Sequence, residues 1–172
     1  MSPLPQPGSR SQVFTVPGAS GGSGLPGAKM KLDSLYTRLS FDDGKIPVGN
    51  VVVWDDAGFA DAANHRFVIP AGQAGRYMVT ARANLYPDGV ATSGYTELSI
   101  RNGALSPAGD YDRTYNIWNE INIGELYPKC SVELVLAAGA ILTLWVINSL
   151  DITLNVDTNI ASGTYLALMK IG

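Results

Sequence analysis

The chain contains a single cysteine and a single histidine among its 172 residues. Because Cys130 has no partner within the chain, no intrachain disulfide can form, and both oxidising and reducing compartments remain open to the protein. Because His65 stands alone, one chain cannot assemble a site with several histidine ligands, and any Ser-His-Asp triad would have to use this one residue. We interpret Cys130 as a buried, inert thiol and His65 as a residue at the edge of a strand.

Charge is also scarce. Charged residues make up 16% of the chain, whereas about 25% is usual for soluble domains, and the formal net charge is -3. A negative chain lacks the basic surface that nucleic-acid binding requires, so we expect no nucleic-acid partner. A surface with so few charges is typical of a protein that is covered by other subunits, which predicts an oligomer.

No run of apolar residues is long enough to cross a membrane as a helix. The longest charge-free apolar stretch, Leu134 to Leu150, is interrupted by Ala-Ala-Gly-Ala and falls short of the roughly 18 apolar residues that a spanning helix needs. We interpret it as two strands and a turn, and expect no membrane insertion. The first residues, Met-Ser-Pro-Leu-Pro-Gln-Pro, lack the basic and apolar regions of a signal peptide, so we expect no export by that route.

The sequence has no motif of a known catalytic or phosphate-binding site, such as a GxxxxGK[ST] loop, a GxSxG elbow or an HExxH helix. Acidic pairs occur at Asp42-Asp43, Asp55-Asp56 and Asp110/Asp112. Carboxylates are suitable calcium ligands, but aspartate also favours turns through hydrogen bonds to nearby backbone. We interpret all three pairs as solvated turn residues, and predict a non-enzymatic protein without catalytic residues, cofactor or metal.

Residues 1–29 form a segment rich in glycine, proline and serine, with Arg10 and Lys29 as its charged residues. Such a composition cannot bury enough apolar surface to fold alone, so we predict an extended arm. Within it, Ser11 to Val16 has β character and suits addition to a neighbour's sheet edge, with Val13, Phe14 and Val16 as the assembly anchor; a passive linker is the alternative. Four Gly-X-Y triplets from Gly18 to Lys29 fit either a flexible spacer or a short collagen-like stalk.

From Met30 to Gly172 the sequence consists of short alternating runs separated by Gly, Pro, Asn and Asp, which is typical of a β-sandwich. In the clearest run, Tyr77 to Leu85, alternate residues are apolar, so one face is expected to pack on a core. Asn102-Gly103 predicts a tight hairpin turn after the strand around Thr96 to Ile100. Further strands are predicted over Val48–Trp54, His65–Ile69, Asn116–Tyr127, Ser131–Leu136, Ile141–Ile147 and Thr164–Ile171.

The strand predicted over Ile141–Ile147 is apolar on both faces. In a sandwich, one face of a strand meets the core of its own chain, and the other needs a different cover. Another copy of the chain is the simplest cover, and symmetric oligomers are built in this way. We therefore predict a trimer interface that includes Trp145, Ile147, Leu144 and Tyr165.

Five segments in this region resemble, in order and spacing, blocks of the C1q/tumour-necrosis-factor-like family, especially its phage and bacterial members. They are Trp54–Phe59, Arg66–Ala81, Leu98–Gly103, Val132–Gly139 and Gly163–Gly172. The resemblance covers residues 30–172. It implies an antiparallel jelly-roll β-sandwich that is trimeric about a three-fold axis and is used for binding or structure.

The resemblance, the arm and the missing signal peptide together predict a structural protein of a bacteriophage virion. We expect a homotrimer that decorates the capsid, with the arm bound to the major capsid protein or another virion protein, made in the host cytoplasm and located on the particle surface. Two alternatives are a receptor-binding module of a tail fibre or tail tip, and a bacterial surface adhesin with a short collagen-like stalk. For a host-surface glycan or protein, the candidate ligand-facing residues are Tyr86, Tyr111 and Tyr115.

Overall fold

A computed structural model describes residues 24–38, 42–49, 51–89, 93–103, 110–119, 126–157 and 163–172, with the backbone alone described for residues 93 and 110–119. The described chain is built from strands, with one short 3-10 turn at Ala62–Asn64. The predicted all-β class is confirmed. The strands are β1 (Gly27–Lys31), β2 (Tyr36–Arg38), β3 (Asp42–Lys45), β4 (Val51–Asp55), β5 (Ala60–Asp61), β6 (Arg66–Val68), β7 (Gly75–Arg82), β8 (Leu85–Pro87), β9 (Ser93–Asn102), β10 (Asp110–Asn119), β11 (Lys129–Leu136), β12 (Ile141–Asn148), β13 (Leu154–Val156) and β14 (Tyr165–Lys170).

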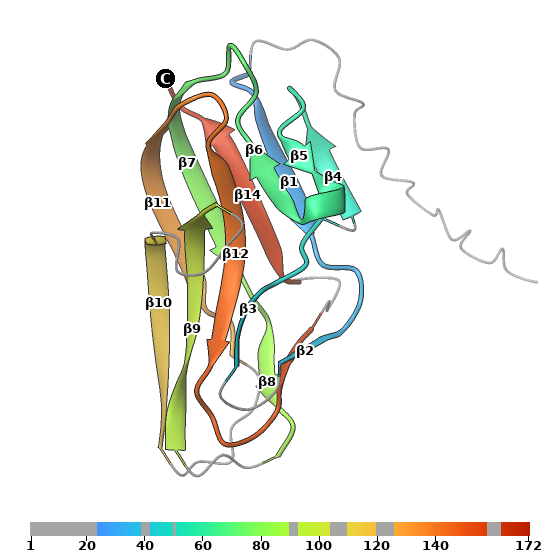
Figure 1. The fold of residues 1–172 in the computed structure, drawn as a ribbon, viewed down its shortest axis with the longest axis vertical. Coiled ribbons are helices and arrows are strands. Elements are labelled where there is room, and N and C mark those ends of the chain that lie inside the picture. Colours follow the sequence, from blue (N-terminus) through green and yellow to red (C-terminus); the bar gives the residue numbers. More distant parts are fainter. Residues whose placement is uncertain are drawn as a thin grey trace, which may run out of the picture.

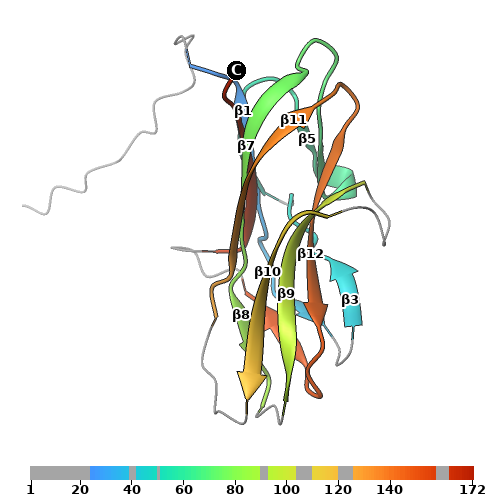
Figure 2. The same cartoon turned by 90° about the vertical axis from the view of Figure 1, so that its left-hand side faces the viewer.

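The strands form three sheets, and all of their pairings are antiparallel. A five-stranded sheet has the order β11-β7-β14-β1-β4 (Figure 1). A six-stranded sheet has the order β10-β9-β12-β6-β5, with β3 also paired to β12, and a small sheet has the order β2-β13-β8. Seen from the side, the two large sheets form two layers, an arrangement consistent with a β-sandwich (Figure 2).

The alternation of apolar residues fixes which side of each strand faces the core. In β7, Tyr77, Val79 and Ala81 are buried, whereas the outward Arg76 and Met78 are exposed. The opposite layer contributes apolar side chains from β9 and β12 to the same core. The ring of Tyr77 lies edge-on to that of Phe59, with 5.9 Å between centroids, and its hydroxyl donates to the carbonyl of Gln73. Cys130 is 2% exposed, as predicted, and its thiol donates to the carbonyl of Leu98 (3.1 Å).

Three sequence predictions need correction. Strand β1 begins at Gly27, so the ordered body starts before Met30, because pairing with β14 and β4 fixes residues 27–29. The pair Asp42-Asp43 lies in strand β3 rather than in a turn, because it pairs with β12. The aspartates at 110 and 112 likewise lie in strand β10, and their side chains are outside the described residues.

The predicted hairpin turn after β9 is also different. Strand β9 ends at Asn102 and Gly103 has a φ of +91°, but β10 begins at Asp110, so a two-residue turn does not connect the two strands. Asn84, a polar position within the predicted run Tyr77 to Leu85, is completely buried, because β7 ends at Arg82 and the chain turns into β8. Its carbonyl accepts a hydrogen bond from the backbone of Asp157 (2.8 Å).

Within the described residues, no helix is long and apolar enough to span a membrane.

Candidate functional site: an apolar face and a polar cluster

The outer side of the five-stranded sheet carries a shallow apolar groove of about 280 Å³. Its floor is formed by β14, β7 and β1, and β4 closes one side. The lining residues are Lys29, Trp54, Met78, Thr80, Tyr165, Ala167, Leu168 and Met169. We call the outward side chains of Trp54, Met78, Tyr165, Ala167 and Met169 the apolar face. Met78 is 37% exposed and Met169 is 51% exposed, so this face is open in the single chain.

Glycine at position 27 allows Trp54 to lie against the sheet. A Cβ atom at Gly27 would lie 2.8 Å from the Trp54 ring and 2.6 Å from the carbonyl oxygen of Leu168. Both distances are shorter than any normal contact, so a larger residue would push Trp54 away from its position. The indole is therefore held as a fixed wall of the groove.

Among the described residues that line this groove, Lys29 alone carries a charge. Its ammonium lies 4.2 Å from the centroid of the Tyr165 ring, a cation–π geometry. The remaining wall is mostly methionine, alanine, leucine and aromatic carbon, with Thr80 as its other polar residue. Methionine side chains are flexible and adapt to irregular partner surfaces, which suits this face to protein contact.

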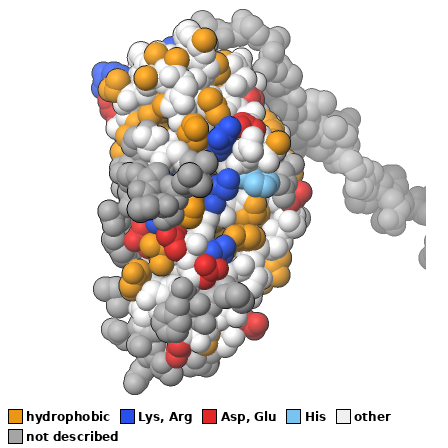
Figure 3. Space-filling model, viewed as in Figure 1, with side chains coloured by type: hydrophobic (Ala, Val, Ile, Leu, Met, Phe, Trp, Pro, Cys, Tyr) orange, Lys and Arg blue, Asp and Glu red, His pale blue; other side chains and the backbone are white. Residues whose placement is uncertain are grey.

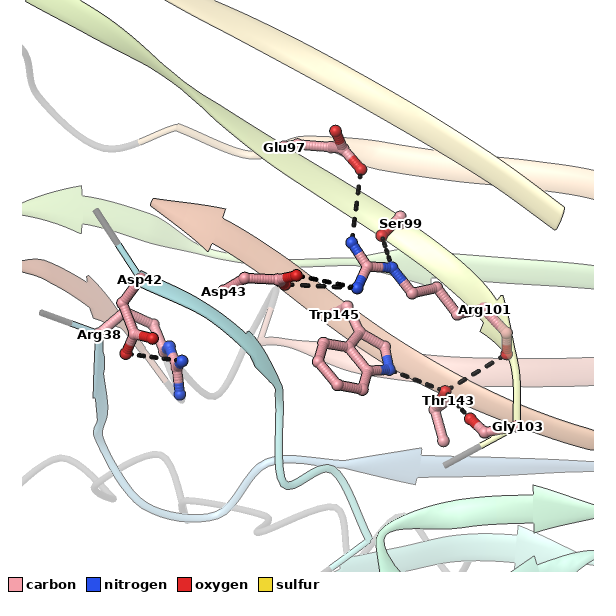
Figure 4. A network of polar contacts seen from close by, with 9 residues as sticks. All are labelled: Arg38, Asp42, Asp43, Glu97, Ser99, Arg101, Gly103, Thr143 and Trp145. Carbon is pink, nitrogen blue, oxygen red and sulfur yellow. Dashed lines mark hydrogen bonds and ion pairs between the residues drawn. The ribbon is translucent and has the colours of Figure 1, made fainter. Parts of the chain in front are cut away.

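The outer side of the six-stranded sheet has a different character. Figure 4 shows Arg101 of β9 at the centre of a polar cluster. Its Nη1 donates to the Asp43 carboxylate of β3 at 3.2 and 3.3 Å, and its Nε donates to Ser99 Oγ at 3.1 Å. The Glu97 carboxylate lies 3.8 Å from Nη2. The Arg101 side chain is 6% exposed and that of Glu97 is 4% exposed, so this ion-pair cluster is largely removed from water.

Trp145 of β12 forms the base of this polar cluster. The Arg101 guanidinium carbon lies 4.7 Å from the centroid of the indole ring. The indole Nε1 donates to Thr143 Oγ1 (2.9 Å), and that hydroxyl lies 2.7 Å from the carbonyl oxygen of Gly103, to which it donates. Thus the polar edge of the tryptophan is paired within the chain, and its face is covered by arginine (Figure 4).

A second ion pair lies beside the polar cluster. Arg38 and Asp42 approach to 2.6 Å, and the Arg38 guanidinium also donates to the Tyr36 hydroxyl. A hollow of about 210 Å³ lies next to this pair, lined by Asp42, Asp43, Tyr95, Ile147, Asn148 and Ser149. On the molecular surface seen in Figure 3, positive and negative side chains are interspersed with apolar ones near the middle of this side.

The structure places the four predicted interface residues in three different environments: the core, the outer side of the six-stranded sheet, and the groove of the five-stranded sheet. Leu144 is completely buried in the core, so it is removed from the predicted interface, because side chains of β12 alternate and this one faces the other layer. Trp145 is 7% exposed beneath Arg101, and Ile147 lies on the same outer side. Tyr165 lies in the groove of the opposite sheet. The middle of the second face of β12, at Thr143 and Trp145, is thus buried in the single chain without another copy, whereas Ile141 and Ile147 are partly buried.

The other predicted site residues are dispersed. Tyr86 lies in the short strand β8, pairs with Asn155 and is partly buried. Tyr111 and Tyr115 lie in β10, whose side chains are outside the described residues. The predicted anchor of Val13, Phe14 and Val16 also lies outside them.

No metal-ligand set is visible in the described part of the chain, where no group of three or more His, Cys, Asp and Glu residues comes together. Asp55 instead accepts hydrogen bonds from four successive backbone N–H groups, those of residues 57–60, which is the turn role predicted for it. His65 follows the 3-10 turn with a φ of +51° and precedes β6.

No family model and no curated protein sequence matches this chain. The two outer faces therefore have to be interpreted from their own chemistry.

Sequence reasoning did not find the apolar face. A partial signal was present in the last strand, where Tyr165, Ala167 and Met169 alternate with the core residues Leu166 and Leu168, so that both sides are apolar. The contributions of Trp54 and Met78 come from strands far away in sequence. Their neighbourhood follows from the pairing of β1 with β4 and of β14 with β7, which no local pattern reveals.

Proposed function

We propose that this chain is a non-enzymatic structural protein of a bacteriophage virion, and that it assembles as a homotrimer through the apolar face. The observation that carries the proposal is the groove on the five-stranded sheet, whose exposed wall is aromatic and methionine-rich with one charged residue, Lys29. An exposed apolar patch on a charge-poor protein marks a contact surface for another protein.

A second copy of the same chain is the occupant that the composition favours. With 16% charged residues, the chain has little polar surface to spare, and each copy offers the same apolar face. Closed point symmetry lets identical subunits cover such faces without leaving an open end. The number three rests on the resemblance of residues 30–172 to the C1q/tumour-necrosis-factor-like jelly rolls.

The arm connects this trimer to its particle. Its composition provides no core, and its Ser11–Val16 segment has the β character needed to dock on another protein. We propose the major capsid protein or another virion protein as the partner, with the trimer on the particle surface. A position at the tail, where the body would contact a host glycan or protein, would use the same trimer and the same arm.

The test compares the native masses of three full-length proteins. Met169→Glu places a carboxylate in the apolar face, and Leu35→Glu places one at a loop position of similar exposure, 55% against 51%. The unmodified protein and Leu35→Glu should have three times the chain mass of 18.2 kDa, while Met169→Glu should be monomeric. A trimeric Met169→Glu protein, or a monomeric unmodified one, contradicts this assembly.

The particle location is tested with a chain that lacks residues 1–23. This deletion removes none of the core residues, which begin at Ala28, so the shortened protein should fold and form trimers. It should be missing from purified particles that contain the full-length protein. Equal amounts of both chains in particles would show that the arm is not the attachment device.

A further inference from the structure

Strand β4 is an edge of the five-stranded sheet, and its pairing with β1 is irregular between Lys29 and Met30. Among the described residues it pairs with β1 alone. Val52 is 42% exposed and Val53 is 47% exposed, and the residues from Val51 to Trp54 include no charge and no proline. Folded proteins normally blunt an exposed edge with lysine, proline or a very short strand, because free backbone N–H and C=O groups there accept a further strand.

The opposite edge of the same sheet is protected in the usual way. Strand β11 carries Lys129 and Glu133 on its exposed side, and Glu133 forms an ion pair with Arg76 of β7. Charges at such positions disfavour the approach of another strand. The two edges of one sheet therefore differ, and β4 is the edge that suits strand addition.

The β4 edge is also held rigidly. Asp55, at its end, accepts hydrogen bonds from the backbone of the next turn, including those of Gly58 and Phe59 at 2.9 Å. The following residue, Asp56, is bonded through its N–H to the carbonyl of Gly27 (2.9 Å). A preorganised edge binds an incoming strand more tightly, because only the incoming strand loses conformational freedom.

We infer that β4 binds residues Ser11–Val16 of a second copy of this chain as an added antiparallel strand. The segment reads Ser-Gln-Val-Phe-Thr-Val, which is uncharged, free of proline and rich in β-branched and aromatic residues. It has six residues against the five of β4, whose first four residues are likewise uncharged. Main-chain hydrogen bonds supply the attraction in this type of contact, and alternate side chains supply the selectivity.

The direction of the sheet sets what a donor within the same chain would have to do. All pairings in this sheet are antiparallel, so a strand added to β4 in the same sense runs parallel to β1. A donor from the same chain would have to return along the sheet through residues 17–26, and the carbonyl of Pro26 is already bonded to the backbone of Lys170 (2.9 Å). A second copy needs no such return, and it is the donor we infer; closure within one molecule is the opposing outcome of the test.

This inference rests on the proposed function in one respect, that the arm is an attachment device. Of the partners proposed for the arm, it commits to a virion protein other than the major capsid protein, namely the β4 edge of a neighbouring copy. Arms exchanged in this way add a second contact that is too weak to hold the Met169→Glu protein together in a native-mass measurement, but that a disulfide can trap.

Disulfide trapping between two full-length chains with different tags tests the pairing. One chain carries Thr15→Cys and the other Val53→Cys, and they are mixed and oxidised; Val13→Cys and Phe14→Cys scan the register. Facing residues on paired strands have Cα separations that a disulfide can bridge. The control acceptor is Val135→Cys on β11, which is 81% exposed. The native Cys130 is 2% exposed and is present in every chain.

The expected result is a disulfide-linked dimer carrying both tags with Val53→Cys, and loss of that dimer with Val135→Cys. Equal trapping by the two acceptors overturns the inference. So does a doubly substituted chain, Thr15→Cys with Val53→Cys, that closes its disulfide within one molecule at dilutions where dimers disappear.

Native mass separates this inference from the proposed function. If the protein is trimeric but Val53→Cys is trapped no more than Val135→Cys, the strand pairing is wrong and the assembly through the apolar face stands. Specific trapping in a protein that is otherwise monomeric shows that assembly through the apolar face is wrong, while the strand pairing stands. Adding Met169→Glu to the Val53→Cys chain should abolish the trimer and retain the trapped dimer.

Discussion

The outer sides of the two large sheets place their polar and apolar groups in opposite ways. On the six-stranded sheet, Arg101, Glu97 and Thr143 are buried, and the Trp145 ring lies under the guanidinium. On the five-stranded sheet, Met169 and Met78 are exposed beside a fixed indole. The first side pairs most of its polar groups within one chain, although Glu97 Oε1 is buried without a hydrogen-bond partner, and the second leaves apolar surface in contact with water.

This difference separates folding from assembly. A buried ion pair contributes little net stability, yet removal of one partner is strongly destabilising because it leaves a charge without compensation. Substitutions in the polar cluster should therefore unfold the chain. Substitutions on the apolar face remove a contact that the single chain does not make, so they should change association more than folding.

The largest expected effect is that of Trp145→Asp. The change removes the ring under Arg101 and the hydrogen bond to Thr143, and it adds a buried carboxylate near Glu97. We expect a loss of about 3–5 kcal/mol of unfolding free energy, as for other deletions of buried aromatic rings. Denaturant titration measures it, with Trp145→Phe as the milder control. A Trp145→Asp protein as stable as the unmodified one would show that the polar cluster does not support the fold.

Arg101→Met should rank second. It leaves the Glu97 carboxylate, whose side chain is 4% exposed, without its cation. We expect a loss of about 2–4 kcal/mol, somewhat below the range for fully buried pairs, because Asp43 is 35% exposed. The double variant Arg101→Met with Glu97→Met should recover part of this loss in the same titration. If the double variant is less stable than Arg101→Met, the uncompensated charge is not the cause.

Gly27→Ala should change both the stability of the fold and the association of the chains. The new methyl group would meet the Leu168 carbonyl and the Trp54 ring, so Trp54 must leave its position on the apolar face. Overpacking of this kind costs about 1–3 kcal/mol. We also expect weaker trimers by native mass. The control is Gly172→Ala, where the nearest atom to the added carbon lies 3.9 Å away. Unchanged trimers with Gly27→Ala would remove Trp54 from the contact.

The smallest effect is expected at an ion pair outside both faces. Asn64 and Arg66 donate hydrogen bonds to Asp61 and hold the pKa of its carboxyl below the ordinary 3.8. The stabilisation is therefore complete above pH 3.8 and is lost as the pH falls through the lower pKa of the folded state. Its size should be about 0.2–1 kcal/mol, as for other accessible pairs.

Acid titration of stability checks the Asp61 prediction. Asp61→Asn should be less stable than the unmodified protein at neutral pH, and the difference should shrink under strongly acidic conditions. A difference that does not change with pH would show that the carboxylate charge is not involved.

The sequence predicted most long strands and missed several short ones for a physical reason. The long strand β10 is an exception, because it covers Asp110–Asn119 and overlaps the predicted Asn116–Tyr127 only at residues 116–119. Gly75–Arg82 and Ile141–Asn148 are long enough to show an alternation or an apolar run. Strands of three residues, such as β2 and β13, cannot show a period of two. Asp42–Lys45 contains residues with low β propensity and is held in a strand by its pairing with β12.

The candidate sites were less predictable, because they join residues that are distant in sequence. The Arg101–Asp43 contact spans 58 positions, and neither residue has a local pattern that indicates the other. The apolar run of Ile141–Ile147 was interpreted as a need for another subunit. Arg101 on the neighbouring strand covers Trp145 instead. A hydropathy pattern counts arginine as polar, although its guanidinium can stack on an indole ring.

The position of Cys130 makes its alkylation rate a measure of how often the sandwich opens. Its thiol comes from β11 in one layer and is bonded to the carbonyl of Leu98 in the other, so a reagent reaches the sulfur only after the layers separate. With one cysteine in the chain, each alkylation event reports one such separation. If the proposed assembly forms, the labelling rate of the assembled protein divided by that of the free chain is a dimensionless factor that measures how strongly assembly holds the sandwich closed.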